Sequence, residues 1–260
     1  MKRMRVKRGL GASRNALRQL FFQRCFYLFT TLLAMIMLAP FIEDTQAGVL
    51  TRNVINVFVV LSAVAAVGRS LVSFLTVLLL ALPALVLRWR SVSSENPAFV
   101  DLALGFDVAV YATAIALLLR YVFDREVMTS DRLWGAASAY LMIGLLWSFL
   151  FAIVDRIQPG SFAVRGEIGT LALHDLIYFS FSSLTTTGFG DIVPVGRIAK
   201  TAATLQVIIG QLFIAILIAK LVGVYPATLQ EKKREELDSS ENEDDKGIRS
   251  ISRPKGQAIA

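Results

Sequence analysis

The chain has 260 residues, of which 55% are hydrophobic and 18% are charged, and its formal net charge is +7. Its mean hydropathy of +0.59, together with apolar runs near the ~20 residues that cross a bilayer, excludes an ordinary water-soluble domain. Its one cysteine excludes an internal disulfide. We therefore expect an all-α membrane protein.

A basic arm, residues 1–24, opens the chain and contains eight Lys or Arg residues and no acidic residue. Basic residues beside a first span favour the cytoplasmic side, so we predict a cytoplasmic N-terminus. The same charges suit contact with anionic membrane lipid. Few aromatic residues accompany them, which argues against a nucleic-acid partner.

Six apolar runs are predicted to be transmembrane helices. They cover residues 25–41, 49–67, 71–87, 99–121, 133–154 and 198–222. An even number of spans places both termini in the cytoplasm of a multi-pass protein of the cell membrane. In the fourth span Asp107 is a carboxylate among apolar residues, which costs about 2.5–3.5 kcal/mol unless it is paired, protonated or near the interface. We expect Arg88 to be its partner in a structural ion pair, with a regulatory site as the alternative.

A glycine-containing string, Thr-Thr-Thr-Gly-Phe-Gly-Asp, occupies residues 185–191 between two apolar segments. Glycine opens backbone angles that allow successive carbonyls to face the same side, and such carbonyls can replace the hydration shell of a cation. The twelve residues before it, 174–185, are apolar but too short to span, and Asp175 is predicted to cap them. We interpret these segments as a re-entrant pore helix and a filter loop; an ordinary glycine turn between helices is the alternative.

The string resembles the signature of the potassium channel family. The resemblance implies that the backbone carbonyls of Thr186, Thr187, Gly188 and Phe189, with the Thr186 hydroxyl, bind potassium, and that Gly190 ends the filter. Thr187 and Phe189 stand where valine and tyrosine are commonest, yet neither departure removes a carbonyl. Potassium is then the permeant ion, and no cofactor is expected.

The resemblance also assigns residues that support the filter. Tyr178 and Asp191 occupy the positions of an aromatic residue and an acid that hold each other in the family, so we expect a hydrogen bond between them. Thr185 joins the pore helix to the filter.

The last span carries the expected gate. Gly210 lies 20 residues after Gly190, the spacing of the inner-helix hinge glycine in the resembled family. A small residue that allows close helix packing is an equally good interpretation. Ile214 and Ile218 follow one and two turns later and could form a hydrophobic constriction.

The resemblance implies a pore domain, residues 133–223. Within it, residues 155–173 contain one proline and three glycines, which predicts an exposed turret loop. The four earlier spans, within residues 25–123, become a sensor-like scaffold. Their fourth span has no basic residue before Arg120, so the channel should be weakly voltage-gated or not voltage-gated. Residues 224–260 are charged and predicted to be largely disordered.

One filter loop per chain cannot form a ring, so the resemblance implies a homotetramer. A weakly selective cation channel and a non-conducting membrane scaffold with a pore fold remain the alternatives. A potassium-uptake subunit would carry four such loops in one chain. No motif of an enzyme active site stands clear of the spans.

Overall fold

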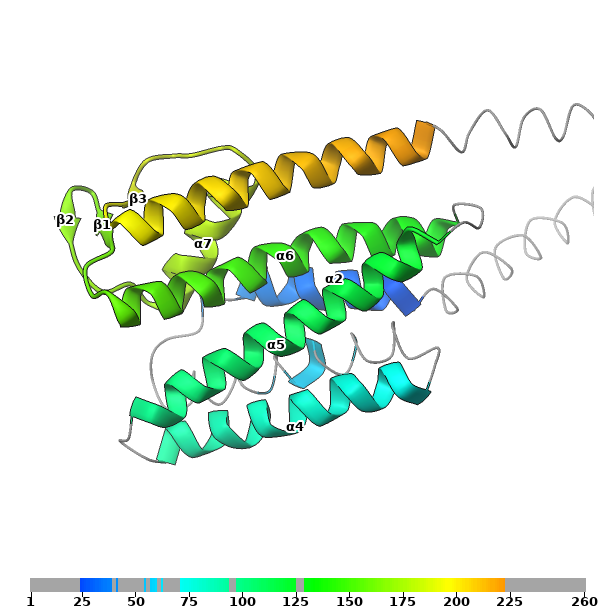
Figure 1. Ribbon diagram of the computed structural model, residues 1–260, viewed down its shortest axis with the longest axis horizontal. Helices are drawn as coiled ribbons and strands as arrows, with labels where there is room; N and C mark the ends of the chain where they lie inside the picture. Colours follow the sequence, from blue (N-terminus) through cyan, green and yellow to red (C-terminus); the bar gives the residue numbers. More distant parts are fainter. Residues whose placement is uncertain are drawn as a thin grey trace, which may run out of the picture. The chain divides into compact units, whose positions relative to one another are not determined.

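The computed structural model of the chain is mostly helical, with one small sheet (Figure 1). It describes residues 24–38, 41, 54, 57–59, 62, 71–93, 97–124 and 129–222. The elements are α2 (Arg24–Leu38), α4 (Leu71–Ser93), α5 (Pro97–Val122), α6 (Ser130–Ile157), β1 (Phe162–Val164), β2 (Glu167–Ile168), α7 (Leu173–Leu184), β3 (Ile192–Pro194) and a final helix, Arg197–Val222. We call this last element the C-terminal helix.

Three helices in the described part of the chain are long and apolar enough to cross a membrane: Ala98–Val122, Ser130–Ile157 and Arg197–Val222. They correspond to the fourth, fifth and sixth predicted spans. The first predicted span is represented by the shorter helix α2, of 15 residues, and the third by α4. The second lies largely outside the described residues, as do the basic arm and the charged tail, so the six-span count stays a prediction.

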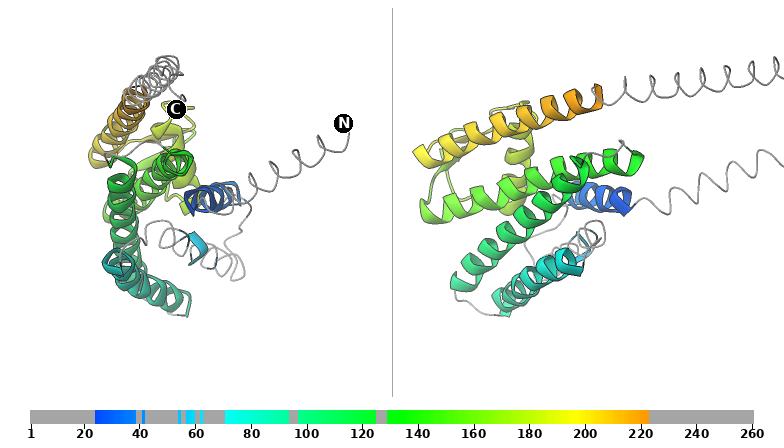
Figure 2. Two further views of the ribbon diagram at one scale, coloured as in Figure 1. Left: turned by 90° about the vertical axis from the view of Figure 1, so that its right-hand side faces the viewer. Right: turned by 45° about the vertical axis from the view of Figure 1, so that its right-hand side comes forward.

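Helix α5 packs against both α4 and α6, and α6 also contacts α2 and α7 (Figures 1 and 2). The α4–α5 contact contains small and branched apolar side chains, which allow the two helices to approach closely: Val77, Ala81 and Ala84 from α4 and Val110 from α5. Near the end of α4, the buried guanidinium of Arg88 forms an ion pair with the buried carboxylate of Asp107. The predicted pairing is thereby confirmed.

The Arg88–Asp107 pair is continuous with an aromatic contact to α6. The Arg88 guanidinium lies 5.9 Å from the centroid of the Phe149 ring, a cation–π distance. Tyr111, one turn beyond Asp107 on α5, meets the same ring edge-on at a centroid distance of 5.3 Å. The residues around the Arg88–Asp107 pair therefore connect α4 and α5 to α6, the outer helix of the expected pore.

At the opposite end of α6, Asp131 ties three helices together. Its carboxylate accepts hydrogen bonds from the backbone N–H of Cys25, at 3.1 Å, and from the hydroxyl of Tyr121, at 2.8 Å. Cys25 is fully buried.

The predicted turret loop is wrong in part, because α6 continues to Ile157 and the next residues form strands. β1 pairs antiparallel with β2 and with β3, in the order β2-β1-β3. Arg165 and Gly166 both have positive φ, the backbone of a tight two-residue hairpin turn. Gly166, one of the glycines of the predicted loop, lies in this turn. Phe162 is fully buried and packs edge-on against Phe151 and Phe179, which anchors the sheet to the helices.

Candidate ion pathway

The pore helix predicted at 174–185 is α7, Leu173–Leu184. The predicted capping role of Asp175 is wrong: the helix begins one residue before the expected start, and its N-cap residue, Ala172, makes no side-chain cap. Asp175 lies in the first turn instead, where its charge still favours the positive end of the helix dipole.

Buried hydrogen bonds hold the middle of α7 against α6 and the C-terminal helix. The Ser180 hydroxyl donates to the Gly144 carbonyl at 2.6 Å. The side-chain amide of Gln206 donates to the hydroxyl and the carbonyl of Ser180, at 2.7 and 3.0 Å. Both Ser180 and Gln206 are fully buried. Sequence reasoning missed Gln206, although a polar residue inside the apolar run 198–222 was a usable signal.

The end of α7 has a further support that the sequence did not indicate. The Tyr140 hydroxyl, from α6, donates to the carbonyl of Leu184 at 3.1 Å. That carbonyl belongs to the last turn of α7, whose carbonyls have no partner inside the helix. The level at which the filter begins is therefore fixed by an outer-helix side chain.

Consecutive N–H groups of residues 186–189, in the predicted filter, all donate back to the end of α7. Thr186 N–H bonds to the Ser183 carbonyl at 3.0 Å, and the N–H groups of Thr187 and Gly188 bond to the Ser182 carbonyl at 2.9 and 3.2 Å. Phe189 N–H bonds to the Ser182 hydroxyl at 3.4 Å. Ser182, which the sequence did not single out, accepts three of these four hydrogen bonds.

These bonds fix the direction of the filter carbonyls. In a planar trans peptide the N–H of one residue points opposite to the C=O of the residue before it, and no cis peptide occurs among the described residues. N–H groups of residues 186–189 that face α7 therefore require carbonyls of residues 185–188 that face away from it. A one-sided row of carbonyl oxygens results.

Backbone angles along the filter agree with this arrangement. Thr186, Gly188 and Gly190 have φ values of +59°, +57° and +80°, whereas Thr187 and Phe189 do not have positive φ. Reversal of φ at every second residue keeps successive peptide groups oriented alike, as in the backbone nests whose N–H groups all face one side. Positive φ is costly for a β-branched residue such as Thr186, and strain of this kind clusters at functional sites.

Hydroxyl groups surround the inner end of the filter. The hydroxyls of Thr185 and Thr187 lie 2.8 Å apart, and the Thr185 hydroxyl also donates to the Phe181 carbonyl at 2.7 Å. The Thr186 hydroxyl donates to the Thr185 carbonyl at 2.6 Å and is 3.5 Å from the side-chain amide of Gln211. All three threonines are exposed in the single chain.

The outer end of the filter is held by α7 and by the sheet. The Tyr178 ring stacks on the Phe189 ring at a centroid distance of 6.0 Å and an interplanar angle of 10°. Partial burial and the nearby Asp191 carboxylate raise the pKa of Tyr178 above its usual value of 10.0. The Asp191 carbonyl in turn accepts from Arg165 N–H at 2.8 Å, and β3 follows at once. The structure thus brings together Tyr178 and Asp191, the pair expected to support the filter.

Gly210 lies where the C-terminal helix meets the end of α7. A Cβ atom added to it would be 2.8 Å from both the carbonyl oxygen and a methyl group of Leu184. This close approach fits the packing interpretation of Gly210. Ile214 and Ile218, on the same helix, have exposed side chains.

Two comparisons with known proteins give a match. Residues 133–225 match a family model described as ion channel. The inward rectifier potassium channel Kirbac3.1 of Paramagnetospirillum magnetotacticum is 27% identical over 81 residues, which are 30% of this chain and 24% of the relative. Residues 133–225 are therefore similar to ion channels, and 81 residues of the chain are similar to a potassium channel.

The chain spans only about a quarter of the length of this relative. No solved structure matches the chain. The family match covers α6, the sheet, α7, the filter loop and the C-terminal helix, while α2, α4 and α5 lie before it. The match and the apolar helices support a membrane protein with an ion channel domain.

Proposed function

We propose that this protein is a potassium-selective channel in which the carbonyls of Thr186, Thr187, Gly188 and Phe189 bind dehydrated K⁺ on the axis of a homotetramer. The single observation that carries the proposal is the row of filter N–H groups bonded to the end of α7, since it turns the carbonyls of residues 185–188 to the opposite side. Carbonyl oxygens so arranged can replace the hydration shell of a potassium ion.

The surface of the C-terminal helix supports assembly. Only 17% of its most apolar 18-residue window is buried, compared with 50% for α6. Its exposed side chains include Leu205, Ile208, Ile209 and Leu212. Such an apolar helix needs a cover of lipid or of other helices, and four copies around one axis would supply both that cover and the missing three filter loops.

The scaffold supports a channel with weak or absent voltage gating. Arg120 is the only basic residue of α5, and it lies in the last turn. Moving one charge through 100 mV contributes roughly 2.3 kcal/mol, and steep gating needs several such charges in each subunit. With the basic arm in the cytoplasm, the proposed topology places both termini inside and the filter toward the outer side.

The test is a reversal-potential measurement on the purified full chain in planar bilayers, with potassium on one side and sodium on the other. A reversal potential close to that of potassium supports the proposal. A value near zero replaces it with a weakly selective cation channel, and assembled protein without current replaces it with a scaffold.

Gly188→Ala is the matched variant, because alanine is strained at φ +57° inside the filter. Its control is Gly166→Ala, at φ +92° in the hairpin turn, where an added Cβ also meets no atom within 4 Å. We expect loss of current in the first and retained current in the second, with both variants assembled. Equal currents in the two variants would refute the role of the filter backbone.

A further inference from the structure

One face of α4 is apolar and exposed along most of the helix. Residues 71–87 contain no charged side chain. The exposed side chains follow each other at alternating spacings of four and three, which places them on one face of a helix: Leu75, Leu79, Leu82, Val86 and Trp89. Leu79 is 72% exposed and Trp89 is 50% exposed. We call this surface the α4 stripe.

Two arginines near the end of α4 point in different directions. Arg88 is buried and pairs with Asp107 between the helices. Arg90 is exposed and makes no ion pair with any residue that the structure describes. The α4 stripe therefore ends at an exposed positive charge.

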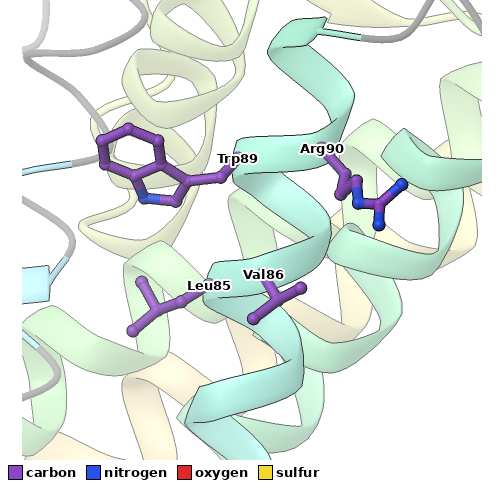
Figure 3. Close-up of a pocket in the computed structure, with 4 residues that line it drawn as sticks. All are labelled: Leu85, Val86, Trp89 and Arg90. Carbon is purple, nitrogen blue, oxygen red and sulfur yellow. The ribbon is translucent and has the colours of Figure 1, made fainter.

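A groove of about 400 Å³ lies at this end of the stripe. The described residues that line it are Leu85, Val86, Trp89 and Arg90. In Figure 3, Leu85 and Trp89 project to the left of the helix, Arg90 projects to the right, and Val86 lies in front between them. The groove therefore combines an aliphatic floor with one indole ring and one guanidinium group.

The groove lies at the same end of the helices as the sheet formed by β2, β1 and β3. Arg156, in the last turn of α6, forms an ion pair with Asp101 near the start of α5, and α5 begins four residues after α4 ends. The strand β1 follows directly after α6. Tryptophan is enriched where hydrocarbon meets head groups, and arginine extends its charge to that level.

We propose that the groove binds an anionic phospholipid, with the head-group phosphate on Arg90, the glycerol region against Trp89 and an acyl chain along the α4 stripe. Charge complementarity selects an anionic head group, because the guanidinium can bond two phosphate oxygens and no described carboxylate competes for it. From Leu75 to Trp89 the helix rises by fourteen residue steps, about 21 Å, which exceeds the ~15 Å hydrocarbon depth of one leaflet. The stripe is thus long enough for a whole acyl chain.

The experiment measures which lipid contacts Trp89 in the full chain. Purified protein is placed in nanodiscs of zwitterionic phosphatidylcholine that contain a small equal fraction of either brominated phosphatidylglycerol or brominated phosphatidylcholine, since bromine quenches tryptophan emission on contact. The difference between wild type and Trp89→Phe isolates the Trp89 emission from that of the other tryptophans.

We expect brominated phosphatidylglycerol to quench Trp89 with an apparent affinity about fivefold higher than brominated phosphatidylcholine, which corresponds to roughly 1 kcal/mol for one basic side chain at an anionic surface. Arg90→Gln should remove the preference and Arg90→Lys should keep most of it. Arg120→Gln is the matched control, because Arg120 is exposed near the opposite end of α5 and its loss should change nothing at Trp89.

Equal quenching by the two lipids in wild type would overturn the proposal, as would a preference that survives Arg90→Gln. Absence of quenching by either lipid would mean that protein covers the groove, and it would also overturn the proposal. None of these outcomes depends on ion conduction, so a failure here is separate from a failure of the proposed channel activity.

Discussion

Gly210→Ala tests whether the C-terminal helix is held against the end of the pore helix. The new methyl group would be 2.8 Å from the Leu184 carbonyl oxygen and 2.8 Å from a Leu184 methyl group, closer than real Cβ contacts. Leu184 cannot easily withdraw, because its side chain is fully buried and its carbonyl is bonded to the Tyr140 hydroxyl. The C-terminal helix must therefore shift by a few tenths of an ångström.

Two opposing contributions decide whether Gly210→Ala raises or lowers the free energy of unfolding. Alanine is more favourable than glycine inside a helix by about 1 kcal/mol. Overpacking in a tight contact costs about 1–3 kcal/mol, and a contact with backbone belongs in the upper part of that range because rotamer changes cannot relieve it. We expect a net loss of about 1–2 kcal/mol per subunit.

Gly105→Ala is the control, because an added Cβ at Gly105 on α5 meets nothing within 4 Å. Thermal unfolding of the purified assembly, followed with potassium flux on the same preparation, should show a lower transition temperature and lower flux for Gly210→Ala alone. An unchanged transition temperature with reduced flux would refute the packing argument and identify Gly210 as a hinge.

Three further variants probe other contacts. Gln206→Leu should lower the unfolding temperature by removing two hydrogen bonds to Ser180, at about 1 kcal/mol each, and a flux loss without destabilisation would contradict this. Tyr178→Phe keeps the ring but removes the hydroxyl near the Asp191 carboxylate, so potassium-over-sodium selectivity should fall in reversal-potential measurements while assembly is unchanged. Asp107→Asn leaves Arg88 buried without its counter-charge and should destabilise the protein by about 3–5 kcal/mol in denaturation, whereas unaltered stability would show that the pair is not formed.

The sequence predicted the helices of the pore segment well because their signals are local. The pore helix was placed within one residue at each end, since an apolar run of fixed length is bounded there by polar and glycine residues. The Arg88–Asp107 pair was also predictable, because a carboxylate among apolar residues needs a partner and few were available.

The turret and the buried polar contacts could not be predicted in the same way. Strands of two and three residues carry no periodic pattern, and β1 is defined mainly by its pairing with β3, about thirty residues later. Gln206 could equally have faced a cavity, a second copy or lipid until the position of Ser180 was known. Non-local pairing, not local propensity, decides both cases.

Thr187 shows how the structure explains a departure from the family signature. Valine is commonest at this position, and the sequence indicated only that threonine would leave the carbonyl in place. The Thr187 hydroxyl lies 2.8 Å from that of Thr185, which itself donates to the Phe181 carbonyl in the last turn of α7. Valine could keep the shape but not this link, so the substitution adds a side-chain connection between the filter and the pore helix. The Thr187 N–H donates to the Ser182 carbonyl, and it belongs to the same peptide group as the Thr186 carbonyl. The hydroxyl link and this N–H bond therefore both help to keep the Thr186 carbonyl facing away from α7.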